Sequence, residues 1–390
     1  MNNKSKADVL SGTWNYPTSM IFGVDAVLRV PDLCKEQGLM NPLLVCDRGI
    51  VDLPFVHSLI AAFSSASLLL GVFSDVKANP TGKNIDNGVV AFKQGNHDAV
   101  IALGGGSALD AGKAIALMSG QNRVLWDFED EGDNWTRVIV DGVAPIIALP
   151  TTSGTGSEVG RASVIVDELR QKKVVIFHPK MLPATVVCDP KLTIGLPPAV
   201  TAATGVDAFV HCFEAYCSPC FHPMADGIAL EGMRLIKENL LTACLDGDNL
   251  VARANMMAAS SMGATAFQKG LGAVHALAHP LGAIFDKHHG LLNAILLPFV
   301  IQRNVTVISS KLENIARYLQ LDVCSAEGFV EWVTSWRREL GIPHHLKDIG
   351  IGIDRAEEIG LFAVNDPSAS GNPLPLTAAE YTEIFLQAAG

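Results

Sequence analysis

The sequence predicts an α/β domain followed by an all-helical domain. The chain has 390 residues, which is more than one ordinary hydrophobic core accommodates. Up to about residue 196, short apolar runs alternate with helical segments; beyond it, nearly every segment is long, helical in pattern and rich in Ala, Leu and Met. We therefore expect one domain over residues 1–196 and a second over residues 197–390.

Apolar runs in the first half have the length of strands. They are Leu43–Cys46, Leu68–Phe73, Ala99–Leu103 and Pro145–Leu149, then the shorter Ser163–Val166, Val174–Phe177 and Thr185–Cys188. A helix is expected over 83–94 and another ends near Met118. Continuous apolar strands separated by helices predict a mostly parallel sheet covered on both faces. The acidic segment Trp126–Trp135 is expected to be a solvated loop.

Composition excludes several function classes. A net charge of −11 argues against a general nucleic-acid binder. No apolar run reaches the roughly 18 residues that span a bilayer, and the N-terminus has no signal-peptide core, so we expect a cytoplasmic enzyme without a membrane segment. The eight cysteines form no disulfide framework, and Cys217 and Cys220 lack the second pair that structural zinc requires.

Two loops at predicted strand ends are rich in glycine and hydroxyl groups. Gly104–Ser107 lies between a strand and a helix, where backbone N–H groups at a helix start can hold a pyrophosphate. A plain tight turn explains this short motif equally well. Thr151–Glu158 follows another strand, and ligands of open parallel sheets bind at the carboxyl ends of strands. Together the two loops favour a dinucleotide site.

Asp47 ends an earlier predicted strand. There a carboxylate can accept a hydrogen bond from a ribose 2′-hydroxyl and repel a 2′-phosphate, which favours NAD over NADP. A helix-capping aspartate is the alternative explanation.

The strongest signal comes from histidines in the second half. His275 and His279 are four residues apart, as are Asp207 and His211, so each pair shares one helical face. With His289, these residues can give one oxygen and two or three nitrogens to a divalent cation. Buried histidines without a metal are the alternative. Fe(II) and Zn(II) both accept such ligands.

These motifs, taken in order, resemble those of the iron-containing (group III) alcohol dehydrogenases, in the superfamily of glycerol dehydrogenase and dehydroquinate synthase. The resemblance runs from about Tyr16 to Pro373. Its motifs are Gly104-Gly105-Gly106-Ser107-x-x-Asp110-x-x-Lys113, Thr151-Thr152-x-Gly154-Thr155-Gly156-Ser157-Glu158, Asp207-x-x-x-His211 and His275-x-x-x-His279 with His289-Gly290-x-x-Asn293. The resemblance implies a dehydroquinate synthase-like architecture, with a dinucleotide-binding α/β domain, a helical domain and an active site in the cleft between them.

The resemblance also implies roles for individual residues. The metal ligands would be Asp207, His211, His275 and His289, with His288 only a neighbour, and His279 would transfer a proton. The implied contacts with NAD are Asp47, Gly105, Gly106, Ser107, Asp110, Thr151, Thr152, Thr155 and Lys173. The family also implies a homodimer.

Two departures from the family pattern concern the substrate. The segment from Phe267 to Gly272 is one residue shorter than usual and carries Lys269, and Ala162, after Arg161, replaces a bulkier residue. Lys269 or Arg161 could hold a distal anion. Alternatively, Lys269 faces solvent at a helix end.

The leading functional hypothesis is reversible hydride transfer between a primary alcohol and NAD, with NADP as the alternative cofactor and Fe(II) or Zn(II) as the metal. The second is an ω-hydroxy acid dehydrogenase acting on a semialdehyde. A metal-dependent lyase on the same scaffold is the third. A non-catalytic NAD-binding protein is the fourth, and it leaves the clustered ligands without a use.

Overall fold

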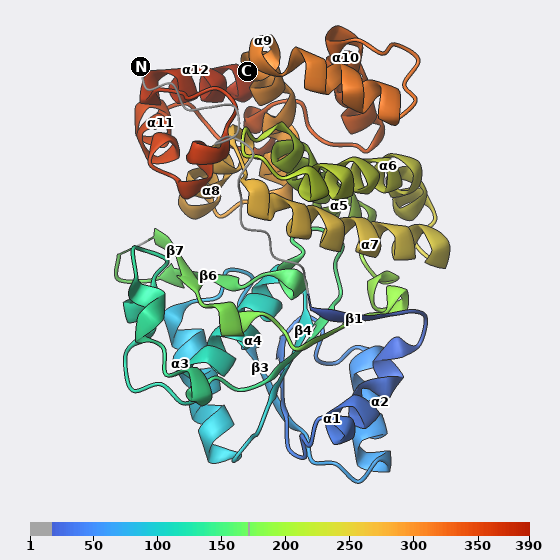
Figure 1. Cartoon of the computed structure of the whole chain (residues 1–390), viewed down its shortest axis with the longest axis vertical. Helices are drawn as coiled ribbons and strands as arrows, with labels where there is room; N and C mark the ends of the chain where they lie inside the picture. Colours follow the sequence, from blue (N-terminus) through green and yellow to red (C-terminus); the bar gives the residue numbers. More distant parts are fainter. Residues whose placement is uncertain (1–17, 171) are drawn as a thin grey trace. The chain divides into compact units, whose positions relative to one another are not determined.

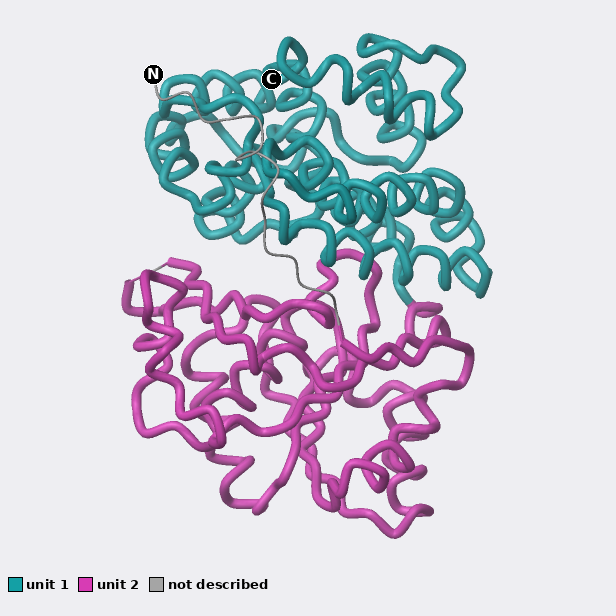
Figure 2. The backbone as a smooth tube through the Cα atoms, in the orientation of Figure 1, with its two compact units in different colours: residues 1–16, 196–390 teal, residues 17–195 magenta. Residues whose placement is uncertain are grey.

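The computed structural model describes residues 18–170 and 172–390. Tyr16, where the family resemblance begins, and the N-terminal segment expected to lack a signal peptide lie outside them. The chain divides into two compact units between Gly195 and Leu196 (Figure 2).

The first unit is built on a parallel sheet. Within the described residues the sheet has six strands in the order β1-β8-β5-β4-β2-β3. Their bounds are β1 Ser19–Phe22, β2 Leu43–Asp47, β3 Gly71–Val76, β4 Val100–Gly104, β5 Ile146–Pro150 and β8 Thr185–Cys188. Strands β2, β4, β5 and β8 are almost completely buried, as their continuous apolar runs predicted.

Helices cover both faces of this sheet. They are α1 Val30–Glu36, α2 Pro54–Ser65, α3 Gly82–Gln94 and α4 Gly106–Met118. Figure 1 shows α1 and α2 on one side of the strands and α3 and α4 on the other. An antiparallel hairpin, β6 Ala162–Asp167 with β7 Lys172–Phe177, forms a separate sheet beside α4.

Two details of the first unit differ from the sequence prediction. The strand expected from Leu68 begins at Gly71, because Ser67 has a positive φ of 57° that ends α2 in a turn, and pairing with Leu43 starts only at Gly71. The acidic segment 126–135 is not a simple solvated loop. It contains parts of two short 3-10 helices, Leu125–Phe128 and Asn134–Arg137, and Phe128 is fully buried.

The second unit is helical. Its α-helices are α5 Pro198–Cys217, α6 Pro223–Leu245, α7 Leu250–Ala266, α8 Ala273–Phe285, α9 His289–Tyr318, α10 Ala326–Glu339, α11 Ala356–Val364 and α12 Ala378–Ala389. They share one apolar core to which α5, α8 and α9 contribute fully buried faces. The predicted fold class, an α/β unit followed by a mostly helical one, is confirmed.

Helix α9 is the one described helix that is long and apolar enough to cross a membrane by length and composition. An 18-residue window has a mean hydropathy of 1.6, and 61% of that window is buried inside the protein. Because its apolar side chains belong to the core of the helical unit, α9 is a core helix. The sequence prediction missed this segment because polar residues interrupt its apolar run.

Pro298 lies inside α9 and removes one helical N–H. The guanidinium of Arg337, from α10, donates to the carbonyl oxygens of Ala294 and Ile295 at 3.1 and 2.8 Å. In an unbroken helix the N–H of residue 298 would donate to Ala294 O. Arg337 supplies the donor that proline lacks. Burial lowers the pKa of Arg337 to about 10. The N-terminal part of α9 is thereby held against α10.

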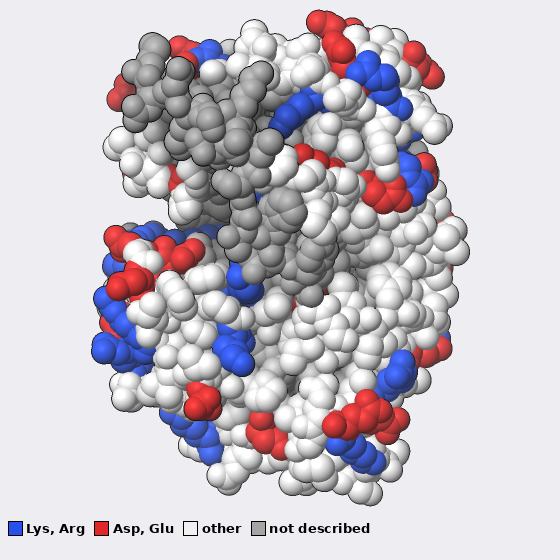
Figure 3. All heavy atoms as spheres, viewed as in Figure 1, with Lys and Arg blue, Asp and Glu red and all other residues white. Residues whose placement is uncertain are grey.

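Acidic and basic side chains are interspersed on the face of the described residues that Figure 3 draws. The cysteine thiols are free. Burial raises the pKa of Cys217 to about 12, which disfavours the thiolate form that binds metals, and its neighbour in the Cys-x-x-Cys pair, Cys220, is exposed.

Candidate functional site

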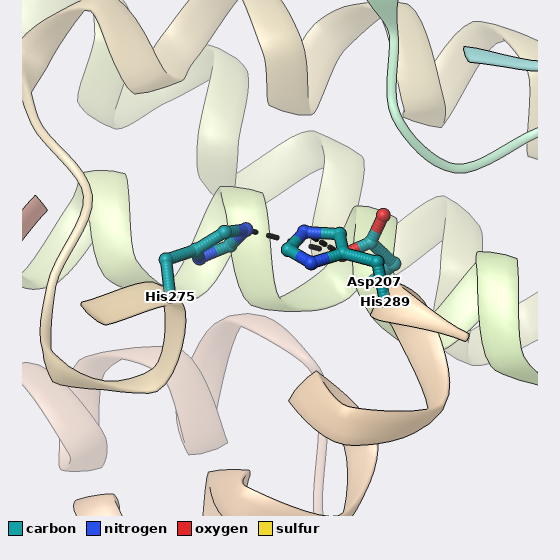
Figure 4. A group of neighbouring side chains, drawn as sticks. All are labelled: Asp207, His275 and His289. Atoms are coloured by element: carbon teal, nitrogen blue, oxygen red, sulfur yellow. Dashed lines mark ion pairs between the residues drawn. The ribbon is translucent and has the colours of Figure 1, made fainter. Parts of the chain in front are cut away.

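Three side chains from three helices of the second unit converge on one point. The Oδ1 atom of Asp207 in α5 lies 3.9 Å from Nε2 of His275 in α8 and 3.8 Å from Nε2 of His289 at the start of α9 (Figure 4). All three ligand atoms lie within 4.8 Å of one another. Ligands at about 2.1 Å around a four-coordinate ion are spaced by about 3.4 Å, so a small inward movement would seat a metal.

The donor set fits a cation. The amide Nδ2 of Asn293 lies 2.6 Å from Asp207 Oδ1 and 3.1 Å from Nε2 of both His275 and His289. Two amide hydrogens cannot serve three acceptors, and the amide oxygen of Asn293 is buried with no hydrogen-bond partner in residues 18–170 and 172–390. Asp207, which is only 1% exposed, and the two histidines direct three acceptor atoms at one point. A divalent ion at that point can satisfy all three acceptors, whereas the Asn293 amide cannot.

His211 lies beside this group and not within it. Its Nε2 is 3.9 Å from Asp207 Oδ1, and its ring stacks on that of His275 with centroids 4.8 Å apart. Its Nδ1 is buried without a hydrogen-bond partner among the described residues. The predicted fourth ligand is therefore adjacent to the three converging atoms.

Burial and neighbouring charges favour the ligand form of His275. Burial lowers its pKa well below the ordinary value of 6.5, and the nearby His211 adds to this effect. The imidazole is consequently neutral at physiological pH, which is the form that binds metals. Nδ1 of His275 lies 2.6 Å from Oε2 of Glu214, a carboxyl whose pKa burial raises to about 7.

His279 lies one helical turn beyond His275. Its ring stacks on that of His289 with centroids 5.4 Å apart, and its side chain is about one third exposed. Nδ1 is 2.8 Å from Oδ2 of Asp366. Burial raises the pKa of Asp366, but the hydrogen bonds from His279 and Ser368 outweigh it and leave the pKa below its ordinary value. An ionised Asp366 holds the proton of His279 on Nδ1 and leaves Nε2 free to exchange one.

In the first unit, the two glycine-rich loops lie against each other. Strands β4 and β5 are parallel and end in register at Gly104 and Pro150, and Thr151 N donates to Gly104 O at 2.9 Å. A Cβ at Gly105 would lie 3.3 Å from Thr152 Cγ2. A larger residue at this position would therefore press against the Thr152 side chain.

Helix α4 begins where these two loops meet. A Cβ at Gly106 would lie 2.7 Å from Thr155 Cγ2, so the loop after β5 packs onto the first turn of α4. The N-cap residue of α4 is Gly105, which has no side chain to occupy the first N–H groups of the helix, and such groups can bind an anion. The hydroxyl of Ser107, the second residue of α4, donates to Ala78 O.

Asp110 and Lys113 tie the second loop to α4. Oδ1 of Asp110 accepts from the Ser157 hydroxyl at 2.6 Å and Oδ2 accepts from Val164 N at 2.8 Å. Lys113 is only 1% exposed, and its ammonium donates to the carbonyl oxygens of Ser157 and Ala162. The contacts of Asp110 are thus with protein donors of the loop and the β6–β7 hairpin, and with the Lys113 ammonium at 3.2 Å.

Two further predicted cofactor residues lie elsewhere in this unit. Asp47 ends β2, where Oδ1 accepts from Gly49 N at 2.8 Å, and Oδ2 would lie 3.4 Å from a Cβ at Gly104. This places its carboxylate beside the first glycine of the loop. Lys173 lies in β7, paired with Val166 across the hairpin.

Lys269 does not face solvent, which corrects one of the alternatives. It ends the short 3-10 helix Phe267–Lys269, and Gly270, with a φ of 134°, turns the chain so that the lysine side chain points inward. Its ammonium donates to Tyr216 O at 3.2 Å, at the C-terminal end of α5, and pairs with Asp226. The helix end and the carboxylate satisfy this buried charge.

The other predicted substrate residues are divided between the units. In the helical unit, the Phe267 ring packs edge-on against His211 with centroids 5.2 Å apart. In the α/β unit, the guanidinium carbon of Arg161 lies 5.6 Å from the centroid of the Phe177 ring. No carboxylate of the described residues pairs with this guanidinium. Ala162 begins β6 next to it.

Glu214 and Asp366 were not predicted as site residues from the sequence. Glu214 follows Asp207 by seven residues and His211 by three, so the same helical-face argument would have found it. Asp366 is 87 residues from His279 in sequence, and no spacing links them.

The comparisons with known proteins decide the family. A model described as iron-containing alcohol dehydrogenase matches residues 17–190, and one described as the C-terminal domain of the Fe-containing alcohol dehydrogenase family matches residues 201–389. The chain belongs to the iron-containing alcohol dehydrogenase family. It is accordingly a metal-dependent oxidoreductase of the alcohol dehydrogenase and aldehyde reductase type, and Asp207, His275 and His289 form the metal-binding group.

Similar proteins match almost end to end. A 4-hydroxybutyrate dehydrogenase of Cupriavidus necator is 36% identical over 95% of this chain and 98% of its own. A 1,3-propanediol dehydrogenase of Klebsiella pneumoniae is 34% identical, covering 95% and 97%. Among solved structures, a 1,3-propanediol oxidoreductase gives a TM-score of 0.92 at 33% identity over 97% of this chain and 100% of that one. The sulfoacetaldehyde reductase of Bifidobacterium kashiwanohense in complex with NAD⁺ gives 0.89 at 26% identity, covering 97% and 100%.

Proposed function

We propose that this member of the family interconverts primary alcohols and aldehydes with NAD as hydride acceptor and donor. The observation that carries the proposal is the convergence of Asp207, His275 and His289 on one point. The metal would be Fe(II) or Zn(II), held by these three residues and by His211. When bound, the ion would supply a Lewis acid for the substrate oxygen and NAD would supply the hydride acceptor.

The residues around the metal group have separate tasks in this proposal. Asp207 offsets the charge of the ion, and the neutral imidazoles complete its ligand set. His279, held through Nδ1 by Asp366, passes the alcohol proton from Nε2 toward solvent, to which its side chain is partly exposed. The stacking of His279 on His289 supports this role, since it keeps the relay next to a ligand.

The first unit would bind NAD, as residues 1–196 were predicted to do. The glycine N-cap of α4 and the two packed loops support a pyrophosphate site at Gly105, Gly106, Ser107, Thr151, Thr152 and Thr155. Asp47 would accept from the ribose. Lys173 would contact the cofactor from the hairpin, and Asp110 would act there through the loop it holds. A relative of similar fold binds NAD⁺.

A second candidate is an ω-hydroxy acid dehydrogenase acting on a semialdehyde. The similarity to a 4-hydroxybutyrate dehydrogenase favours it. The absence of a carboxylate partner for Arg161 among the described residues also favours it, because such a guanidinium can hold a carboxylate bidentately. Lys269 is a weaker candidate for this task, since its ammonium is already paired with Asp226.

A substrate panel tests the proposal. Primary alcohols of increasing length, each compared with its ω-carboxylated counterpart, are incubated with the metal-loaded protein and NAD or NADP, and absorbance of the reduced cofactor is followed. Net NADH formation is expected. Substrate turnover without net NADH would support the lyase alternative instead, because a lyase recycles NAD within each turnover. We further propose a cytoplasmic homodimer, which cell fractionation and light scattering would test.

A further inference from the structure

Glu214 lies against the ring nitrogen of His275 that points away from the metal group. It lies in α5 on the face that carries Asp207, and its side chain is only 4% exposed. Oε2 lies 2.6 Å from Nδ1 of His275, on the side of the imidazole opposite the metal group. Oε1 accepts from the backbone N–H of Val274 at 2.7 Å. Both carboxylate oxygens are thus committed to the first turn of α8.

This contact determines which nitrogen of His275 is free. In its ionised form Glu214 accepts hydrogen bonds and donates none, so Nδ1 of His275 then carries the proton. Nε2 then holds its lone pair toward Asp207 Oδ1, 3.9 Å away. The carboxylate therefore selects the tautomer that can bind a metal.

The chain makes room for this carboxylate. A Cβ at Gly272 would lie 2.9 Å from Glu214 Oε1 and 3.1 Å from Asn372 Oδ1. Asn372 accepts from Ala273 N at 3.2 Å, so two side chains from distant parts of the chain cap the start of α8. Of these two caps, only Glu214 also reaches His275. Asn372, which also hydrogen-bonds to Asn304 and Leu374 O, is consequently a control that removes a cap of α8 without touching His275.

We propose that Glu214 is a positioning residue of the metal centre, which fixes the tautomer and orientation of His275. The inference deepens the proposed function and rests on its assignment of His275 as a metal ligand. Glu214 touches neither substrate nor cofactor in this scheme. Its effect is on metal affinity, and it reaches the reaction only through the ligand.

Glu214→Gln tests this with almost unchanged volume. The amide has one accepting oxygen, whereas Glu214 accepts from both Val274 N–H and His275 Nδ1–H. Whichever way the glutamine amide is turned, its NH₂ group faces either Val274 N–H or His275 Nδ1–H. In the second case His275 can avoid the clash only by moving its proton from Nδ1 to Nε2, which removes the lone pair that binds the metal. Loss of such a supporting carboxylate costs about 10–100-fold in metal affinity. Asn372→Ala removes the other cap and should change metal affinity little.

The readout is binding of Zn(II) and Fe(II) to the full-length metal-free protein, in competition with a chelator of known affinity. Thermal melting of the metal-free forms reports folding separately. A selective loss of metal affinity in Glu214→Gln supports the proposal. A metal affinity of Glu214→Gln equal to that of the wild type overturns the proposal. So does an equal loss of metal affinity in Asn372→Ala when the two variants melt at the same temperature.

A measurement on the unsubstituted protein covers the case in which Glu214→Gln does not fold. At a pH where Glu214 is ionised, the side-chain ¹⁵N shifts of His275 in the metal-free protein should show protonated Nδ1 and unprotonated Nε2. The opposite tautomer overturns the proposal. Neither experiment contains alcohol or NAD, so both remain informative if the substrate panel shows that the proposed reaction is wrong.

Discussion

Gly290 in α9 lies so close to Ala203 in α5 that a Cβ on Gly290 would be 2.5 Å from the Ala203 carbonyl oxygen. The same Cβ would lie 3.1 Å from Cβ of Asp207. Gly290 follows His289, so this helix contact brings a ligand of α9 to the carboxylate of α5. The glycine after the last ligand histidine is therefore a packing requirement of the metal centre.

Gly290→Ala should separate the two helices and weaken metal binding. The close atom is backbone and cannot turn away, so overpacking should cost about 1–3 kcal/mol of stability. Gly227→Ala in α6 is the control, because a Cβ there meets nothing within 4 Å and alanine favours the helix. Melting temperature and metal affinity are measured for both. Unchanged metal affinity in Gly290→Ala would contradict this account of the contact.

His289 and His288 are adjacent and should behave differently. His289→Ala should abolish stoichiometric metal binding and activity together, because Nε2 of His289 belongs to the converging group. His288 instead caps α9 by accepting from Leu291 N at 3.4 Å, and His288→Asn preserves a capping side chain. That variant should retain its metal. Elemental analysis of both variants checks the prediction, and metal loss only in His288→Asn would reverse the assignment.

Asp47→Ser should relax the choice of cofactor. Removing the carboxylate beside Gly104 removes its repulsion of a 2′-phosphate. The ratio of kcat/KM for NADP to that for NAD should rise about tenfold or more, corresponding to about 1.4 kcal/mol. Asp52→Ser, at an exposed turn residue, should leave the ratio unchanged. A constant ratio in Asp47→Ser would favour the local role seen in its bond to Gly49 N.

Arg161→Met and Lys269→Met should separate charge recognition from stability. If the substrate is an ω-hydroxy acid, Arg161→Met lowers kcat/KM for the carboxylated aldehyde and spares the neutral one of equal length. Lys269→Met should lower the melting temperature and affect both substrates alike, because its partners are Asp226 and Tyr216 O. A selective loss for the charged substrate in Lys269→Met would show that the observed pairing opens during binding.

Most of the architecture could be predicted from sequence. Continuous apolar runs identified the buried strands because parallel strands are covered on both faces. The i,i+4 pairs identified two of the metal-bearing helices because helical periodicity places such residues on one face. The edge strand β1 was missed, because only four residues form it and its outermost two are exposed.

What the sequence could not predict depends on contacts between distant segments. The inward turn of Lys269 follows from the φ of Gly270 and from a partner on α6. The pairing of His279 with Asp366 joins α8 to the turn before the 3-10 helix Pro367–Gly371. Such partners are brought together only by tertiary packing, which local periodicity does not encode.

The central claim is that Asp207, His275 and His289 hold a catalytic divalent metal. Alcohol-dependent NADH formation by the full-length protein, stripped of metal by a chelator and then titrated anaerobically with Fe(II) or Zn(II), tests it most directly. The account predicts no turnover without metal and full recovery near one ion per chain, with no recovery in Asp207→Ala. Undiminished turnover by protein that elemental analysis shows to be metal-free would contradict it.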